Sequence, residues 1–246
     1  MKTRILVLWS LPRSRSTAFE WMMRQRGDFH AEHEPFTWAY YFGEDRKTLR
    51  EYQQATLPEK TFATMWRRIR DVSNGQLVFI KDFSYSILPW VSRELLGQMD
   101  HSFLIRDPRE TLPSFHARWP DFTLEETSYA AHRRLYEMLC DQLPTPPPIV
   151  DSQCLVSDPE AIIRAYCAQV GIEFLPQALR WTPGDRREVS DYPGLWHVSL
   201  RTSTCFAAQQ SDEPYQSVES DSRLKLAYDL CRPYYEWMYE RRLRAL

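Results

Sequence analysis

The segment of residues 11–19 carries the residue types best suited to bind an anion. It reads L-P-R-S-R-S-T-A-F and directly follows a short apolar run, residues 5–9. A helix beginning near Ser16 would offer unpaired backbone N–H groups and a partial positive charge to a phosphate. Hydroxyl and guanidinium donors add to it: Arg13, Ser14, Arg15, Ser16 and Thr17. The segment therefore predicts a phosphate-binding loop, unless Ser16 or Thr17 only caps the helix and the arginines are solvated.

Glycine usage narrows the kind of loop. The chain has seven glycines, and the first of them is Gly27. Neither the G-x-x-x-x-G-K-[ST] nor the G-x-G-x-x-G motif is therefore present at this loop. This excludes the ordinary ATPase, GTPase and dinucleotide-binding types of site.

A second candidate anion site follows another apolar run, residues 102–105. Arg106 stands at the carboxyl end of this predicted strand, and Asp107 with Pro108 suits the start of a helix. Ser114 lies one to two turns into that helix. If the two strands are neighbours, Arg106 and Ser114 lie beside the first loop. A salt bridge between Arg106 and Asp107 would explain the pattern equally well.

The elements that must position these residues alternate along the chain. Helical patterns separate five short segments that predict strands, of which the first is an unbroken apolar run: 5–9, 29–31, 77–80, 102–105 and 149–150. This alternation predicts an α/β domain with right-handed crossovers, in which ligands bind beyond the carboxyl ends of the strands. We expect one domain over residues 1–246, ending in a helical segment, 220–246, that breaks near Pro233.

The amino-acid composition limits which binding partners and which cellular compartment we expect. The chain has 246 residues, with 31 Lys and Arg against 33 Asp and Glu, so its net charge is -2. This balance predicts neither a nucleic-acid nor a membrane partner, and favours a small molecule. Five cysteines form no C-x-x-C pair, and no run reaches the about 18 apolar residues that span a bilayer. We expect a cytoplasmic protein.

Together, the two anion segments resemble the sulfotransferase family, whose members use 3′-phosphoadenosine 5′-phosphosulfate (PAPS). In that family a P-[KR]-S-G-[ST]-T loop after the first strand holds the 5′-phosphosulfate, and an R-x7-S element after a later strand holds the 3′-phosphate. Residues 12–17 read P-R-S-R-S-T, and Arg106 to Ser114 keep the second spacing. Arg15 replaces glycine, so a positive φ there would cost about 1 to 2 kcal/mol unless the loop takes another path or Arg15 makes compensating contacts.

The resemblance implies a fold and a reaction. The fold is a single three-layer α/β domain of the P-loop NTPase-like type, with a central, mostly parallel five-stranded sheet. The reaction is in-line transfer of a sulfuryl group from PAPS to a hydroxyl or amine of a small-molecule acceptor. It releases 3′-phosphoadenosine 5′-phosphate (PAP) and requires no metal. A kinase-like phosphotransferase and a non-catalytic nucleotide-binding protein remain as alternatives.

The resemblance also implies roles for single residues. Glu34, the last ionisable residue before Pro35, matches a glutamate that is the general base in several branches of the family. His33 is the rival base, since imidazole titrates near neutral pH. Lys81 ends the third predicted strand and would reach the sulfuryl group, or else pair with Asp82. The family pattern assigns the phosphosulfate and nucleotide contacts to Arg13, Ser14, Ser16, Thr17, Arg106 and Ser114. Arg15, which stands in place of the glycine, and Arg201 are further candidates for nucleotide contacts. The segment around Arg201 resembles the basic C-terminal loop of the family only in composition, and an ordinary polar loop would explain it equally well.

Overall fold

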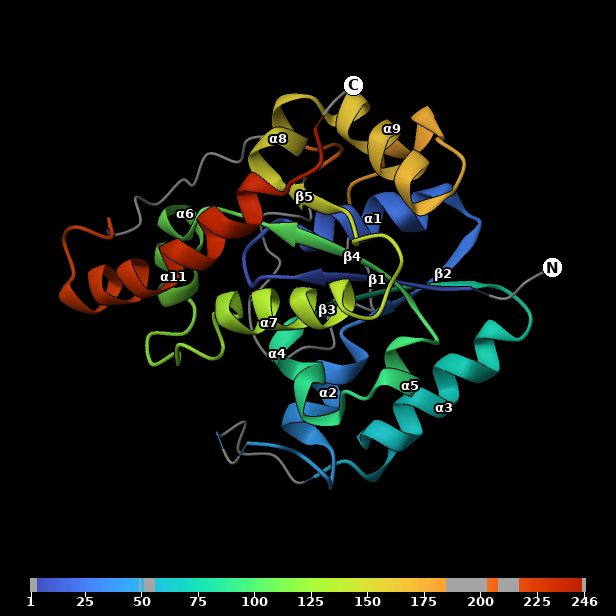
Figure 1. Cartoon of the computed structure of the whole chain (residues 1–246), viewed down its shortest axis with the longest axis horizontal. Coiled ribbons are helices and arrows are strands. Elements are labelled where there is room, and N and C mark those ends of the chain that lie inside the picture. The colour runs from blue at the N-terminus through green and yellow to red at the C-terminus, as the bar shows by residue number, and fades with distance from the viewer. Residues whose placement is uncertain (1–3, 49, 51–55, 185–202, 208–216, 245–246) are drawn as a thin grey trace.

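A central parallel sheet organises the protein. The structure, a computed structural model, describes residues 4–48, 50, 56–184, 203–207 and 217–244. Its five strands are all parallel and follow the order β2-β3-β1-β4-β5 (Figure 1). They are β1 (Ile5–Ser10), β2 (Phe29–His33), β3 (Leu77–Phe83), β4 (Asp100–Ile105) and β5 (Ile149–Asp151). The five predicted strands and the parallel α/β class are confirmed.

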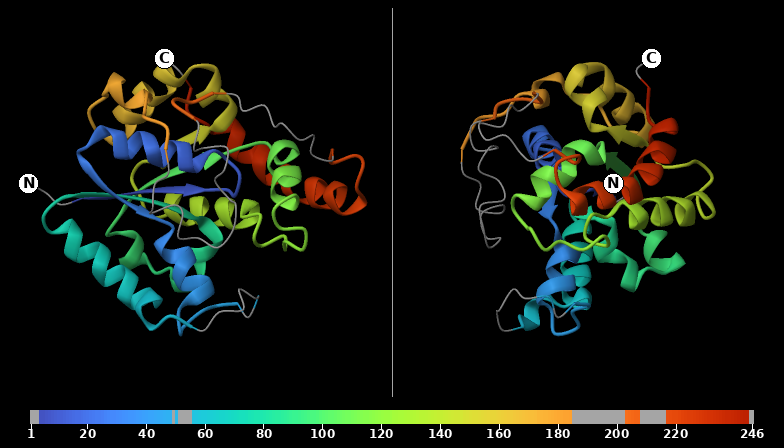
Figure 2. Two further views of the ribbon diagram at one scale, coloured as in Figure 1. Left: turned by 180° about the vertical axis from the view of Figure 1, so that it is seen from behind. Right: turned by 90° about the vertical axis from the view of Figure 1, so that its left-hand side faces the viewer.

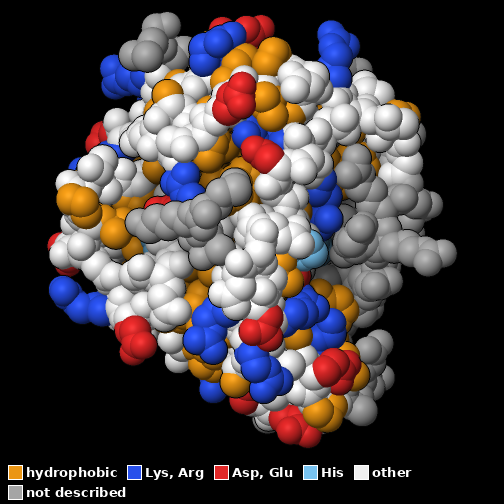
Figure 3. Space-filling model, turned by 90° about the vertical axis from the view of Figure 1, so that its right-hand side faces the viewer, with side chains coloured by type: hydrophobic (Ala, Val, Ile, Leu, Met, Phe, Trp, Pro, Cys, Tyr) orange, Lys and Arg blue, Asp and Glu red, His pale blue; other side chains and the backbone are white. Residues whose placement is uncertain are grey.

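Helices cover both faces of this sheet. Their bounds are α1 (Ser16–Arg26), α2 (Pro35–Phe42), α3 (Phe62–Ser73), α4 (Ser84–Ile87), α5 (Arg93–Leu96), α6 (Pro108–His116), α7 (Tyr129–Cys140), α8 (Ser152–Ser157), α9 (Pro159–Val170) and α11 (Ser222–Glu240). Figures 1 and 2 show α1, α8 and α9 on one side of the sheet, with α2 to α5 and α7 on the other. On the face shown in Figure 3, side chains of both charges are interspersed, as the small net charge leads one to expect.

The central strand shows why the first apolar run is unbroken. Leu6 and Leu8 of β1 pack into one core cluster, with residues of α1 and α9. Val7 and Trp9 point to the opposite face and pack into another cluster, with residues of α3, α7 and α11. Successive side chains of a strand alternate between faces, so a strand buried on both faces needs apolar residues at every position.

The last helix differs from its prediction. α11 runs through Pro233 without ending, where the sequence predicts a break. A proline inside a helix removes one backbone hydrogen bond. Tyr228 and Cys231 before it and Met238 after it are buried, so packing on the core holds both halves of α11 in one helix. None of the helices in the described part of the chain is long and apolar enough to cross a bilayer.

Substitution Leu8→Ala tests the central position of β1. Leu8 is 0% exposed, so removing its side chain leaves a cavity, and the free energy of unfolding should fall by about 3 to 5 kcal/mol. The matched control is Leu226→Ala, since Leu226 is 61% exposed and its loss should change that free energy by less than about 0.5 kcal/mol. Denaturant unfolding measures both, and equal effects would contradict the packing described.

Candidate active site

The loop after β1 is held by its own backbone and by one hydroxyl. The Leu11 carbonyl accepts hydrogen bonds from the Ser14 N–H, at 3.2 Å, and from the Ser14 hydroxyl, at 2.6 Å. Arg13 and Arg15 adopt positive φ angles of 62° and 68°, a conformation that L-residues with side chains rarely take. The buried Ser14 hydroxyl therefore donates within the loop and fixes its shape.

Arg15 makes the compensating contacts that its backbone strain requires. Its Nη1 donates to the Ser152 hydroxyl at 2.8 Å, and its Nη2 lies 3.8 Å from a Glu110 carboxylate oxygen. Burial, and then repulsion from Arg106, lower the pKa of Arg15 to about 10. The side chain remains a cation at neutral pH and adds positive charge to the loop.

The start of α1 carries no competing anion. Its N-cap residue is Arg15, whose side chain makes no capping hydrogen bond, and its first turn holds no acidic residue. The alternative that Ser16 or Thr17 caps this helix is therefore wrong. Both hydroxyl residues are buried in the first turn, 5% exposed each. The positive end of the helix dipole is not neutralised by the helix's own first turn.

The two predicted anion segments touch each other. Nη1 of Arg106 donates to the Arg13 carbonyl at 2.7 Å, and Nε of Arg13 donates to the Ser114 hydroxyl at 2.9 Å. The carboxylate that pairs with Arg106 is Glu110, at 2.6 Å, so the alternative of a salt bridge with Asp107 is wrong. Asp107 instead caps α6, as predicted, by accepting from the Arg109 N–H. Residues 93 positions apart, Arg13 and Arg106, thus meet at one edge of the sheet.

A buried carboxylate follows β2, the edge strand that pairs with β3. Glu34 adopts a positive φ of 50° as the N-cap of α2, and its N–H donates to the Lys81 carbonyl at 2.8 Å. Its Oε1 forms an ion pair with the Lys81 ammonium and lies 3.6 Å from Nε2 of His33. The predicted residues Glu34, His33 and Lys81 are therefore in direct contact, and each is less than a tenth exposed.

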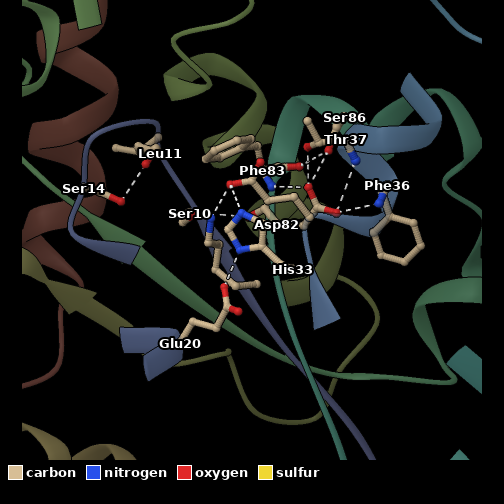
Figure 4. A network of polar contacts seen from close by, with 12 residues as sticks. Ser10, Leu11, Ser14, Glu20, His33, Phe36, Thr37, Asp82, Phe83 and Ser86 are labelled. Carbon is tan, nitrogen blue, oxygen red and sulfur yellow. Dashed lines mark hydrogen bonds and ion pairs between the residues drawn. The ribbon is translucent and has the colours of Figure 1, made fainter. Parts of the chain in front are cut away.

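Asp82 fixes the backbone that carries Glu34. Its carboxylate accepts from the N–H groups of Phe36, at 2.6 Å, and Phe83, at 2.8 Å, and from the Thr37 and Ser86 hydroxyls (Figure 4). Burial, and then the charge of Glu34, raise the pKa of Asp82 to about 6. Lys81 forms its ion pair with Glu34. The alternative of an ion pair between Lys81 and Asp82 is therefore wrong.

Glu20 belongs to this site although the sequence did not single it out. It lies in the middle of α1, is 0% exposed, and its Oε2 is 2.6 Å from Nδ1 of His33 (Figure 4). Its other oxygen, Oε1, accepts from Nε and Nη2 of Arg24 at 2.9 and 2.8 Å. Burial alone would raise the pKa of Glu20, but His33, Arg24 and Lys81 together hold it well below its usual value. The sequence holds one signal of this role: Glu20 is an acidic residue within an apolar stretch of the predicted helix.

One candidate nucleotide-binding residue, Arg201, falls outside the residues that the structure describes. Tyr40, Tyr41 and Phe42, which follow Glu34, are buried and pack with Tyr85 in one aromatic cluster. Among the residues that the structure describes, no group of three or more His, Cys, Asp or Glu side chains is arranged to hold a metal ion. The independence from a metal stays a prediction.

Comparisons with known proteins find a matching family model and two similar plant proteins. A family model described as a sulfotransferase domain matches residues 3–242. Branched-chain-amino-acid aminotransferase-like proteins 2 and 1 of Arabidopsis thaliana are 30% and 31% identical, over 84% and 81% of this chain. The aligned part covers only 37% and 36% of those relatives, so the chain spans little more than a third of their length.

Two solved structures share the fold. A sulfotransferase domain of the olefin synthase of Synechococcus PCC 7002 has a TM-score of 0.52 and 17% identity, covering 92% of this chain and 94% of that one. A sulfotransferase of Alicyclobacillus acidocaldarius has a TM-score of 0.50 and 11% identity, covering 99% and 97%. The predicted P-loop NTPase-like α/β fold with five parallel strands is confirmed by this likeness.

Substitution Asp82→Asn tests the support of the site. The amide would place an N–H₂ group against backbone N–H donors, so the free energy of unfolding at pH 8 should fall by about 2 to 4 kcal/mol. The pKa of Asp82 is higher in the folded protein than in the unfolded chain. Ionisation of this carboxyl should therefore lower the free energy of unfolding of the wild type as the pH rises from about 4 to about 6. The variant should lack that part of the pH dependence.

The control for this substitution is Asp71→Asn on the exposed side of α3, which should leave both quantities unchanged. Denaturant unfolding between pH 4 and 8 provides the measurement. A stability of Asp82→Asn equal to that of the wild type at every pH would show that Asp82 does not hold α2 in place.

Proposed function

Because the chain belongs to the family of sulfotransferase domains, we propose that it transfers a sulfuryl group from PAPS to a hydroxyl or amine of a small-molecule acceptor. The observation that carries the proposal is the hydrogen bond from Arg106 to the Arg13 carbonyl. It joins the two segments whose sequences resemble the two phosphate-binding elements of the family. One nucleotide with phosphates at both ends would therefore span neighbouring cationic sites.

The donor would be held by two groups of cations. The 5′-phosphosulfate would lie on the loop of residues 11–15 and the start of α1, where backbone N–H groups, Arg13 and Arg15 supply donors. The 3′-phosphate would lie against Arg106 and Ser114. Glu110 already pairs with Arg106, so this carboxylate limits the excess positive charge in the absence of nucleotide. Arg13 and Arg15 would thus face the negative charge of the phosphosulfate, and Arg106 that of the 3′-phosphate.

The reaction is a displacement at sulfur. The acceptor oxygen or nitrogen forms a bond to sulfur while the bond from sulfur to the phosphate oxygen breaks, and its electron pair stays with the departing PAP. Arg13 and the positive end of α1 stabilise the negative charge that develops on the leaving phosphate. Lys81, two residues before the end of β3, would supply a further cation near the transferring oxygens. The acceptor's proton goes to the general base.

Glu34 is the better placed of the two candidate bases. Both contacts described above, from Lys81 and His33, are made to its Oε1, so Oε2 is the oxygen that we propose takes the proton. His33 has each ring nitrogen next to a carboxylate, Glu20 at 2.6 Å and Glu34 at 3.6 Å. This arrangement favours a supporting role for the imidazole and proton transfer to Glu34.

Substitution Arg106→Ala tests the second phosphate site. Loss of a charge-assisted contact of about 1.5 to 3 kcal/mol should weaken PAP binding about 10- to 100-fold in calorimetry. Arg164→Ala, which removes an exposed arginine paired within α9, should bind PAP as the wild type does. Unaltered binding by Arg106→Ala would remove the 3′-phosphate site from the proposal.

Substitution Glu34→Gln tests the base. The amide keeps the size of the side chain but cannot take the proton, so kcat should fall about 10²- to 10⁴-fold with PAP affinity retained. Transfer of labelled sulfate from PAPS to a panel of hydroxyl and amine acceptors measures it, with Glu137→Gln on the exposed side of α7 as control. Undiminished turnover would reassign the role to His33, and transfer by no form of the protein would favour non-catalytic nucleotide binding.

A further inference from the structure

Five charged or titratable side chains form a continuous chain behind the proposed base. They come from α1, β2, the residue after β2, and β3: Arg24, Glu20, His33, Glu34 and Lys81. Each contacts the next, and cationic or imidazole groups alternate with carboxylates along the chain. The reaction proposed above uses only the last two members, so the buried Glu20 and His33, and the partly buried Arg24, need a physical reason.

Glu20 is a costly residue to bury. It is 0% exposed within an α1 helix that otherwise packs apolar side chains on the sheet, and an ionised carboxylate loses its hydration there. Arg24 donates two hydrogen bonds to Oε1. Oε2 is directed at Nδ1 of His33, 2.6 Å away. A carboxylate needed only to neutralise Arg24 would not require this second, short contact.

His33 transmits this contact to Glu34. Its ring is 3% exposed, and its two nitrogens face two carboxylates from opposite sides. A contact of 2.6 Å at Nδ1 fixes the rotation of the ring, and thereby the direction of Nε2. Nε2 then lies 3.6 Å, a distance longer than a hydrogen bond, from the same oxygen of Glu34, Oε1, that Lys81 contacts. An imidazole held at this distance limits the positions that Oε1 can take, and with them the direction of Oε2.

We infer that Glu20 is a positioning residue that acts on Glu34 through His33. The inference rests on the proposed function, in which Oε2 of Glu34 takes the acceptor's proton. In that step the proton moves from acceptor to Oε2 as the bond to sulfur forms and the bond to the leaving phosphate breaks. Glu20, Arg24 and His33 gain or lose no proton. Their contribution is to hold the base in the geometry that the transfer requires.

Substitution Glu20→Gln tests this role while keeping the size of the side chain and an oxygen for Arg24. We expect kcat to fall about tenfold or more, with the acceptor KM and the Kd for PAP within about twofold of wild type. The matched control is Asp28→Asn, which removes the carboxylate of a different ion pair, with Arg26, just beyond α1. That variant should keep the wild-type kcat.

A double-mutant cycle separates positioning through His33 from a general effect on the fold. In the background of His33→Asn, the further change Glu20→Gln should alter kcat less than about twofold, because the connection to Glu34 is already broken. An equal loss of kcat in both backgrounds would overturn the inference. So would a Glu20→Gln variant with the wild-type kcat.

Nitrogen NMR supplies a readout that does not depend on turnover. In ¹H–¹⁵N spectra of the imidazole rings, Glu20→Gln should shift both ring nitrogens of His33, and Asp28→Asn should leave them unchanged. Unshifted His33 signals in Glu20→Gln would overturn the inference. A wild type that transfers no sulfate would instead overturn the proposed function, so the two failures are distinguishable.

Discussion

The parallel register of β3, β1 and β4 is the constraint on which the site depends. Leu8 of the central strand stands opposite Lys81 on one side and Ser102 on the other, so all three strands end at one edge of the sheet. Three segments must therefore meet at this edge, whatever their separation in sequence: the loop beginning at Leu11, the consecutive residues Lys81 and Asp82, and Arg106. Open parallel sheets bind ligands at such an edge. The apolar packing of β1 on both faces holds this register. Polar residues placed after the strands in the sequence are thereby brought to the same edge.

The same edge concentrates strain and buried charge. Four non-glycine residues in the described part of the chain have positive φ angles, and three of them, Arg13, Arg15 and Glu34, belong to the candidate site. Such conformations persist only where surrounding contacts over-determine them. Here the contacts are Ser14 with Leu11, Arg15 with Ser152, and the Asp82 carboxylate at the start of α2. Backbone strain and polar contacts together fix the shape of the loop that we propose binds the phosphosulfate, and hold it at the same edge of the sheet as a buried carboxylate.

The sequence was sufficient for the features that follow from local patterns. Short, mostly apolar segments predicted the five strands, and the spacing from Arg106 to Ser114 predicted a second anion segment near the first. Features that depend on contacts across the fold were missed. Glu20 reads as one acidic residue within α1, and only packing of α1 on β2 brings it to His33. The alternative partner considered for Arg106 was the adjacent Asp107, whereas the structure pairs Arg106 with Glu110, four residues on, the spacing that places side chains on one helix face. Pro233 predicts a break, which the burial of Cys231 and Met238 overrides.

The central claim is that Arg13 and Arg106 bind the two ends of one nucleotide, and a crystal structure of the protein with PAP tests it most directly. The account predicts the 5′-phosphate on the loop of residues 11–15 at the start of α1, and the 3′-phosphate against Arg106 and Ser114. A nucleotide bound away from this edge of the sheet, or with only one phosphate on these arginines, would contradict it.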